Sequence, residues 1–425
     1  MSEIYKRSIV DNIKKWLERP EIIVITGSRQ IGKTFLTRKI LPTITNLPIK
    51  YFNFEDMEIR SLFQENPTMF IEGIKSKENI YVFDEFQKVP ELTSFLKVFY
   101  DKDKEKMPKI FLTGSSSLEI QEKISQSLVG QCIVFNLFSL SFAEKYFLAP
   151  RDFLGEILLF KDKLDIEKLQ QEIFFEKADL ARKFDEYILQ GGYPELGEIE
   201  GGQIWQKLKS IIQMILEKDL RGLVKEEHLF SSRKLLEILA FRIGNIISFE
   251  NLAAEMQLNI RTARNLMAVL EGLFFIELIY PKANFANEYK KAPKVYFNDL
   301  GIRNELARMH KLPTDKSQIG NLVENFIFSQ LKRYSAYRKD LKINYWQDYN
   351  KNEVDFVLEV ENKIVSIEVK YQKGQKDRLT AGVRNFIKKY HSQVHITVTV
   401  DYFGSSEING CSVYFIPAYA MGLLI

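Results

Sequence analysis

The first feature with clear chemical meaning is the run Gly27-Ser28-Arg29-Gln30-Ile31-Gly32-Lys33-Thr34. Its spacing, G-x-x-x-x-G-K-[ST], lets backbone N–H groups surround phosphate oxygens, while the lysine reaches the β- and γ-phosphates and the hydroxyl binds Mg²⁺. The run follows the apolar segment Ile22–Ile25 and precedes a helical stretch, Phe35–Ile40, whose N-terminus would direct positive charge at the same anion. We therefore expect ATP to bind at Gly27–Thr34, with Thr34 also contacting the metal ion.

Two carboxylates and a group of hydroxyls end the next apolar segments. Asp84 and Glu85 follow Ile80–Phe83, so we expect Asp84 to hold Mg²⁺ and Glu85 to act as general base on the attacking water. Thr113 or Ser115, at the end of a later apolar segment, could sense the γ-phosphate. Each group alone would also fit an ordinary polar turn. Together with the phosphate-binding run, they favour a nucleotide-hydrolysing site.

A second constellation lies between residues 353 and 370. Glu353–Val360 and Ile364–Lys370 alternate apolar and polar residues, and the residues between them are typical of a turn. Pairing Val360 with Lys363 predicts a hairpin whose apolar pairs share one face. These pairs are Leu358–Val365, Phe356–Ile367 and Val354–Val369. The same register places Asp355 opposite Glu368, and Glu353 opposite Lys370, on the other face.

Two opposed carboxylates repel each other, and a divalent cation between them would remove that cost. The spacing of Asp355, Glu368 and Lys370 resembles that of the PD-(D/E)xK nucleases. The resemblance implies that the two carboxylates bind Mg²⁺ or Mn²⁺ and that the lysine helps activate the attacking water. The alternative is a surface hairpin with cross-strand ion pairs.

One more carboxylate points to the same fold. Glu324 lies inside the apolar arc of a predicted helix, Asn321–Lys332, where a carboxylate needs a partner. Glu324 resembles the helical carboxylate of the nuclease fold, so we expect it to be catalytic. Tyr345-Trp346-Gln347 resembles the strand that precedes the hairpin, with Gln347 assisting the metal ion.

A basic segment, Lys373–His391, follows this constellation. It could form a phosphate-binding face or simply a solvated helix. Its basic residues are Lys373, Lys376, Arg378, Arg384, Lys388 and Lys389, against the single acid Asp377.

The elements that position these residues fall into three parts. Up to about residue 150, apolar segments alternate with helical stretches, which predicts an α/β domain with a parallel sheet covered on both faces. The segments are Glu21–Thr26, Ile49–Phe54, Ile80–Phe83 and Ile110–Thr113. Residues 151–310 are mainly helical. Residues 311–425 predict a helix, three or four strands and another helix, an α/β domain of the nuclease-like kind.

The middle part has the order of a winged helix-turn-helix at about residues 231–300. Three helices, Ser231–Gly244, a second capped by Ser248, and Asn259–Glu271, precede a β pair of Phe274–Tyr280 with Lys294–Phe297. The third helix of such a module can enter the major groove of DNA. Its reading residues would be Arg261, Thr262, Arg264 and Asn265. The alternative is an architectural or protein-binding module.

Together these motifs resemble an AAA-like P-loop ATPase family of archaea and bacteria whose C-terminal domain is of unknown function. The residues that carry the likeness are Tyr51–Asp56, Asp84–Gln87, Thr113–Ser116, Ser139–Glu144, Gly191–Glu195 and Glu217–Leu220. The resemblance covers nearly the whole chain. One departure is Gly130-Gln131, where the family usually has Gly-Arg; it leaves the arginine that would contact the transferring phosphoryl group unassigned.

Composition limits the remaining classes. The chain has 425 residues, of which 45% are hydrophobic and 27% charged, which fits two to four globular domains. No apolar run reaches the roughly 18 residues of a membrane helix, and the N-terminus does not resemble a secretory signal. Two distant cysteines, Cys132 and Cys411, and four histidines argue against a disulfide framework or structural zinc site and favour the cytoplasm. The net charge of +4 is too small to identify a polyanion partner.

Three functions compete. The leading hypothesis is a cytoplasmic ATPase whose nucleotide state controls DNA binding or cleavage by the C-terminal domain. The alternative is a slow nucleotide-dependent switch that forms homo-oligomers and has an inactive C-terminal binding module; Gln131 favours it. The third is a regulator that reads DNA sequence through Arg261 and Arg264.

Overall fold

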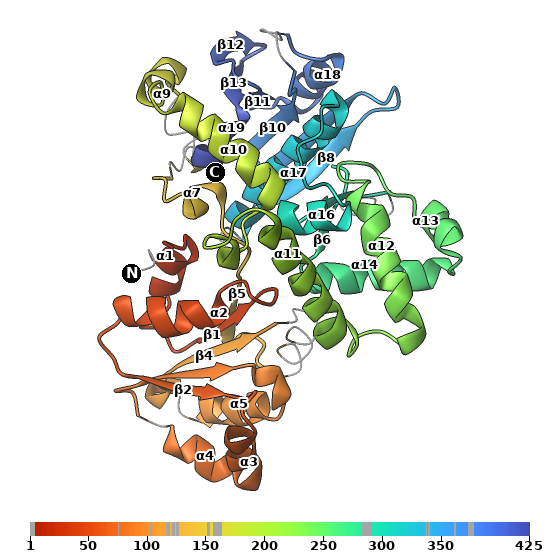
Figure 1. Ribbon diagram of the computed structural model, residues 1–425. Coiled ribbons are helices and arrows are strands. Elements are labelled where there is room, and N and C mark those ends of the chain that lie inside the picture. Colours follow the sequence, from red (N-terminus) through yellow and green to blue (C-terminus); the bar gives the residue numbers. More distant parts are fainter. Residues whose placement is uncertain are drawn as a thin grey trace.

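The computed structural model describes residues 5–425 apart from 75, 103, 116–119, 121–123, 125–126, 151–153, 156–163, 283–290, 337, 339–340, 361–362 and 373–377. The first sheet lies at one end of the molecule and the C-terminal sheet at the other, with the helical part beside them (Figure 1). No helix within the described ranges is both long and apolar enough to cross a membrane.

The N-terminal part is built on a five-stranded parallel sheet of order β2-β3-β4-β1-β5. Its strands are β1 (Ile22–Thr26), β2 (Ile49–Asn53), β3 (Ile80–Asp84), β4 (Lys109–Gly114) and β5 (Cys132–Asn136). The four strands expected from the sequence are confirmed, and β5 is an addition. Its helices are α1 (Ile9–Lys14), α2 (Lys33–Phe35), α3 (Met57–Glu65), α4 (Pro67–Gly73), α5 (Leu92–Lys102) and α7 (Phe142–Lys145).

Both faces of this sheet are covered, as the sequence predicts. Ile23 and Ile25 of β1 belong to the core shared with α1, while Ile22 and Val24 face the core formed with α3, α4 and α5. The expected helix after the phosphate-binding run is interrupted, because α2 passes into a π-helical segment at Leu36–Ile40.

The middle part is helical and ends in a two-stranded antiparallel sheet. Its elements are α9 (Ile166–Glu172), α10 (Lys177–Gln190), α11 (Gly202–Ile215), a π-helical segment (Leu216–Leu220), α12 (Leu229–Ala240), α13 (Phe249–Met256), α14 (Ile260–Gly272), β6 (Ile276–Ile279), β7 (Lys294–Phe297) and α16 (Leu300–Leu306). The predicted β pair is confirmed as β6 with β7, and Ser248 accepts a hydrogen bond from Asn251 N at the start of α13.

The C-terminal part is a six-stranded mixed sheet of order β12-β13-β11-β10-β9-β8. Its elements are α17 (Lys316–Ser335), β8 (Lys342–Gln347), β9 (Glu353–Val360), β10 (Lys363–Val369), α18 (Ala381–Tyr390), β11 (Val394–Thr399), β12 (Gly404–Ile408), β13 (Cys411–Pro417) and α19 (Ala418–Leu424). The expectation of three or four strands was too low, because β11, β12 and β13 extend the sheet.

The hairpin register is confirmed from Lys363–Val360 to Ile367–Phe356, but not beyond it. Between Asn344 and Trp346 the pairing of β8 with β9 shifts by one residue, so β9 carries a bulge. The bulge reverses the alternation of faces, and Val354 packs in the same cluster as Val357 instead of with Phe356.

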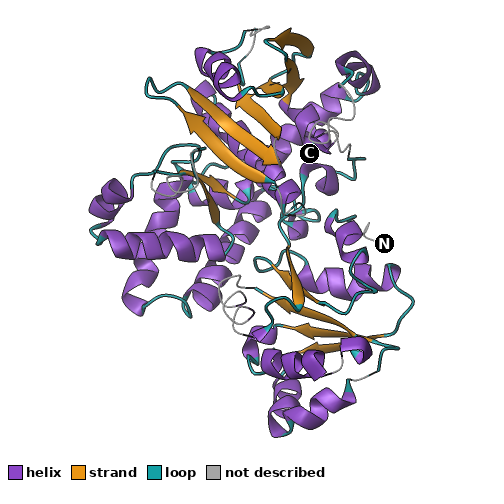
Figure 2. Cartoon of the chain, turned by 180° about the vertical axis from the view of Figure 1, so that it is seen from behind, coloured by secondary structure: helices purple, strands orange, loops and turns teal. Residues whose placement is uncertain are grey.

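The three parts share one hydrophobic core, whose residues run from Ile9 to Leu424. Helix α17 contacts the N-terminal part directly: Gln330 Oε1 accepts a hydrogen bond from Phe142 N at 3.0 Å, and Arg333 Nε donates one to Ser139 O at 2.8 Å. Seen from behind, this junction lies between the two sheets (Figure 2). The P-loop sheet is therefore joined to the rest of the chain by packing as well as by connection.

Candidate functional site

The phosphate-binding run forms a tight loop between β1 and α2. A Cβ atom at Gly27 would come within 2.3 Å of Leu137 O, so only glycine fits there. Gly32 has φ +98°, a backbone conformation that L side chains rarely adopt. Both glycines are therefore required by the backbone, as expected of a loop that surrounds phosphate.

Lys33 is buried beneath this loop. Its Nζ donates hydrogen bonds to Gly27 O at 2.7 Å and to Ser28 O at 2.8 Å. Burial lowers the pKa of Lys33 to about 8, against the opposing charge of Glu85. A polyphosphate in the loop would restore the stabilisation that burial removes from the ammonium.

Three hydroxyls converge on the buried carboxylate of Asp84. Thr34 Oγ1 donates to Asp84 Oδ2 at 3.0 Å, and the hydroxyls of Thr113 and Tyr51 donate to the two oxygens. A hydroxyl and a carboxylate at the end of a phosphate loop are the donor set that Mg²⁺ takes in P-loop proteins. Thr34 and Asp84 therefore fit a Mg²⁺ ion beside the phosphates. Tyr51 was not among the expected site residues.

Glu85 lies beside this carboxylate in an unusual backbone conformation. Its φ is +55°, a left-handed value that costs a non-glycine residue about 1–3 kcal/mol. Burial raises the pKa of Glu85, although Lys33 and Arg29 oppose the shift. Its Oε2 accepts a hydrogen bond from Gln87 Nε2 at 2.5 Å.

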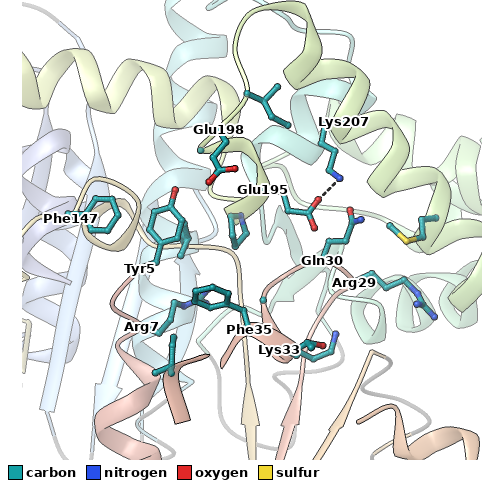
Figure 3. Close-up of a pocket in the computed structure, with 18 of the residues that line it drawn as sticks. Tyr5, Arg7, Arg29, Gln30, Lys33, Phe35, Phe147, Glu195, Glu198 and Lys207 are labelled. Carbon is teal, nitrogen blue, oxygen red and sulfur yellow. Dashed lines mark ion pairs between the residues drawn. The ribbon is translucent and has the colours of Figure 1, made fainter. Parts of the chain in front are cut away.

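A cavity of about 1000 Å³ opens in front of the loop. Lys33, Thr34 and Glu85 belong to its lining. Figure 3 shows Lys33 on one side of the cavity and, away from it, Tyr5 and Phe147, whose rings stack with centroids 5.0 Å apart. Glu195 and Lys207 form an ion pair across another wall. Its lining thus combines the phosphate-binding residues with two stacked aromatic rings, a combination that suits a nucleotide. Sequence reasoning missed Tyr5 and Phe147, which lie far from the motif.

The middle part contributes a charged residue to this site. Asp219, in the π-helical segment after α11, accepts hydrogen bonds from Arg29 Nε at 2.8 and 2.9 Å. Both side chains are almost entirely buried. The motif Glu217–Leu220 contains Asp219, but the sequence alone gave it no role.

Gln131 lies at the opposite end of the sheet. Its carbonyl accepts a hydrogen bond from Ile22 N at the beginning of β1, and its side chain donates to Asp101. An arginine here would not reach the phosphate loop of its own chain. Ser116, the last residue of one quoted motif, lies outside the described residues.

The C-terminal carboxylates surround a lysine. Lys294 Nζ, on β7, lies 3.1 Å from Glu324 Oε1 and 3.6 Å from Asp355 Oδ1, and it also pairs with Glu353. Burial alone would lower the pKa of Lys294, but the negative charge of Glu324 and its neighbours outweighs burial and raises it. The partner that Glu324 needs is thus present, and it is an ammonium group. Glu353 was expected opposite Lys370; the bulge turns it toward Lys294 instead.

The other two expected residues pair with each other. Lys370 Nζ lies 2.7 Å from Glu368 Oε1, and Thr380 Oγ1 donates to both oxygens of Glu368. Asp355 Oδ2 accepts a hydrogen bond from Val369 N at 2.8 Å. Gln347, expected to assist a metal ion, donates to Glu353 at 3.2 Å.

These contacts pair Asp355 and Glu368 with cations and hydrogen-bond donors of the chain itself. In the described ranges no three or more His, Cys, Asp or Glu residues are grouped so as to hold a metal ion. Lys294, Lys370 and backbone and side-chain donors compensate the charge of these carboxylates. The metal site at Asp355 and Glu368 stays a prediction.

The surfaces expected to meet DNA are exposed in part. On α14, Arg261, Arg264 and Asn265 are exposed and Thr262 is half-buried. Arg264 also lies over the Phe249 ring, 4.9 Å from its centroid. On and before α18, Arg378, Arg384, Lys388 and Lys389 are exposed, while Lys373, Lys376 and Asp377 lie outside the described residues.

The five-stranded parallel sheet, with its glycine loop after β1 and its acidic pair after β3, defines a P-loop domain of the AAA type. Residues 19–146 match a family model described as an AAA domain. Residues 181–313 and 319–419 match two models described as domains of unknown function, DUF8612 and DUF4143.

Similar proteins share this arrangement over most of their length. One uncharacterized protein of Methanocaldococcus jannaschii is 28% identical to this chain, over 94% of this chain and 89% of its own length. A second uncharacterized protein of the same organism is 25% identical, over 82% of this chain and 75% of its own length. An uncharacterized protein of Mycobacterium tuberculosis is 24% identical over 86% of this chain and 74% of its own.

Similarity to solved structures is weak. The Aeropyrum pernix ORC1 protein in complex with DNA is 11% identical, with a TM-score of 0.29 over 72% of this chain and 94% of that one. The Thermotoga maritima RuvB Holliday junction branch migration motor is 14% identical, with a TM-score of 0.28 over 66% and 90%. Such low scores say nothing about the partners of this chain.

Proposed function

We propose that this chain is a Mg²⁺-dependent ATPase that acts as a nucleotide-dependent switch in the cytoplasm. One observation carries the proposal: Lys33, Thr34 and Glu85 line a single cavity, and Thr34 bonds the buried carboxylate of Asp84. We assign the functional units to residues 1–150, 151–310 and 311–425, with ATP bound by the first.

Each residue has a distinct role in this proposal. The N–H groups of Gly27–Thr34 and the ammonium of Lys33 bind the phosphates, and Thr113 lies where it can sense the γ-phosphate through Asp84. Mg²⁺, held by Thr34 and Asp84, would neutralise charge on the phosphate oxygens. Glu85 accepts the proton of the attacking water, and its raised pKa makes it a stronger base.

Two variants test this function. Lys33→Ala should abolish ATP binding, because it removes the buried ammonium. Glu85→Gln should keep binding within about twofold and lower kcat by roughly 10²–10⁴-fold, the usual contribution of a general base. Nucleotide affinity by calorimetry and phosphate release measure both. An unchanged affinity in Lys33→Ala would refute the assignment of the phosphate site.

DNA is the partner that we propose for the switch. The support is the exposed basic residues of α14 and α18, because lysines and arginines on one face supply most of the affinity for phosphate backbones. Duplex binding should fall on Arg264→Ala and on Lys388→Ala, with a reduced salt dependence. Binding that neither variant alters would contradict the proposal.

For the C-terminal part we favour a binding or assembly module over a nuclease. The pairing of Lys294 with Glu324, Glu353 and Asp355 supports this choice. Incubation with duplex, single-stranded and branched DNA in Mn²⁺ or Mg²⁺ should give no cleavage. Cleavage that disappears in Asp355→Ala and Lys370→Ala would reverse the choice. ATP-dependent self-association, followed by light scattering, tests the assembly role.

A further inference from the structure

Asp219 brings the middle part into contact with the phosphate loop. It follows α11, the helix whose Lys207 and Met214 line the nucleotide cavity. Arg29 NH2 also lies 2.8 Å from Asp219 Oδ1, so the guanidinium binds the carboxylate through two nitrogens. Two nitrogens on one carboxylate fix the orientation of a guanidinium as well as its position. The orientation of Arg29 in the loop is thus set by a residue 190 positions away in the chain.

The same carboxylate connects to the proposed general base. Ser115 Oγ, at the end of β4, donates to Asp219 Oδ1 at 3.3 Å. Gln87 Nε2 lies 3.4 Å from Ser115 Oγ and 2.5 Å from Glu85 Oε2. A continuous path of side-chain hydrogen bonds therefore runs from Asp219 to Glu85.

Arg29 is a second cation of the cavity, beside Lys33. Its charge influences both Lys33 and Glu85. Asp219 uses Nε and Nη2 of Arg29, whereas Nη1 lies 3.8 Å from Glu55 Oε1. A phosphate in the loop would therefore find a donor on the guanidinium without displacing Asp219, because the guanidinium presents five N–H groups. A phosphate bound there would share the charge of the guanidinium with Asp219 and so link the nucleotide to the segment that follows α11.

We infer that Asp219 is a positioning residue for ATP hydrolysis, which orients Arg29 in the phosphate loop and Glu85 through Ser115 and Gln87. The inference rests on the proposed ATPase function. It also gives the middle part a means of responding to the nucleotide state. The arginine near the phosphates is then supplied by the loop itself, so the absence of arginine at Gln131 does not leave the site without one.

The test compares Asp219→Asn with Asp299→Asn. Asp299 is a matched control: it is also a buried aspartate of the middle part, but it bonds Gly192 N and Ile302 N and does not contact Arg29. Asp219→Asn should lower kcat roughly 10- to 100-fold, as loss of an orienting partner does, with ATP affinity within about threefold. Asp299→Asn should lower the melting temperature while the folded enzyme keeps its kcat.

Two further measurements separate positioning from mere structural support. Ser115→Ala should lower kcat without changing the melting temperature. It removes the hydrogen bonds that link Asp219 to Gln87 and leaves the contact between Asp219 and Arg29 in place. In a double-mutant cycle, Arg29→Ala and Asp219→Ala should be strongly non-additive in kcat. If Asp219→Asn folds poorly, Ser115→Ala, which leaves Asp219 in place, decides the question.

The outcomes are distinct. A kcat within twofold of the parent in both Asp219→Asn and Ser115→Ala would overturn the inference, and so would a loss that only matches the unfolded fraction. In either case a parent that hydrolyses ATP beside an inactive Lys33→Ala leaves the proposed function intact. A parent that neither binds nor hydrolyses ATP would overturn both.

Discussion

Two buried lysines, Lys33 and Lys294, show how neighbouring groups set the pKa of a buried ammonium group. Burial lowers the pKa of Lys33 to about 8, because its hydrogen-bond acceptors are neutral carbonyls. Lys294 is equally buried, yet its pKa is raised, because carboxylates surround it. Lys33 is therefore prepared for an incoming anion, whereas Lys294 is already compensated.

The state of Lys33 predicts a pH dependence of ATP binding. The phosphates favour the charged ammonium, so above pH 8 binding must take up a proton and the affinity should fall as the pH rises. Below that range the affinity should be nearly constant. Calorimetry at pH 8.5 in buffers of different ionisation enthalpy measures the uptake. A binding enthalpy independent of the buffer would contradict the low pKa.

His395 predicts a second pH effect, this time on stability. Burial lowers its pKa to about 3, and its ring bonds Ser366 and Thr397. An unfolded histidine takes up a proton below about pH 6.5, while the folded one does not. Unfolding free energy should therefore fall as the pH drops from about 6.5 to 4, by up to about 1.4 kcal/mol per pH unit. In His395→Gln the unfolding free energy should depend less steeply on pH. If urea titrations gave the parent and the variant the same dependence on pH, other groups would be the cause.

Residues that act through a contiguous motif could be predicted from the sequence, and the others could not. Gly27–Thr34 and Asp84–Glu85 are recognised because the chemistry needs them in a fixed local order. Asp219 and Lys294 act across long separations in the chain, so their roles depend on packing. The available indications were a lysine at the start of the otherwise apolar segment Lys294–Phe297 and, for Asp219, the motif Glu217–Leu220.

At the scale of elements, the pattern of apolar and polar residues predicted the strands but not the β-bulge in one of them. The parallel strands of the first sheet and the hairpin β9–β10 follow from apolar runs and period-two patterns. The bulge in β9 depends on β8, which pairs along its other edge. One extra residue moved Glu353 to the face of Lys294, so this carboxylate pairs with Lys294 and not with Lys370, the partner expected from the sequence.

The ion-pair cluster around Lys294 joins β7, α17 and β9, so its loss should be costly. Lys294→Met leaves buried carboxylates without their cation and should destabilise the fold by about 3–5 kcal/mol. The effect should be larger at pH 8 than at pH 5, because burial raises the pKa of Glu324 to about 7, and a protonated Glu324 does not need the cation. Chemical denaturation at both values measures it.

The matched control is Lys282→Met, which removes a lysine bound to one carboxylate of the same strand, Glu359, at 2.6 Å. Its cost should be about 1 kcal/mol, since that pair is more exposed. Equal costs for the two variants would show that Lys294 is not the centre of the cluster.

At the scale of the whole molecule, the shared core predicts cooperative unfolding. Arg333 on α17 bonds Ser139 O of the N-terminal part and Asn298 O of the middle part. Arg333→Met should therefore lower the melting temperature of the whole chain. Calorimetry should show one transition, and the fluorescence of a nucleotide analogue at the P-loop should report the same midpoint. Two transitions, of which Arg333→Met shifts only one to a lower temperature, would show that the parts unfold independently.

The core that runs from Ile9 to Leu424 also constrains how this architecture can change over generations. Domains that recombine freely usually meet through small polar surfaces. Here a gene fusion that replaced residues 319–419 alone would leave Phe142 and Tyr187 without Phe326, whose ring lies 6.0 and 5.6 Å from theirs. The three segments matched by separate family models should therefore be inherited together, and substitutions on α17 should be accompanied by substitutions around Phe142.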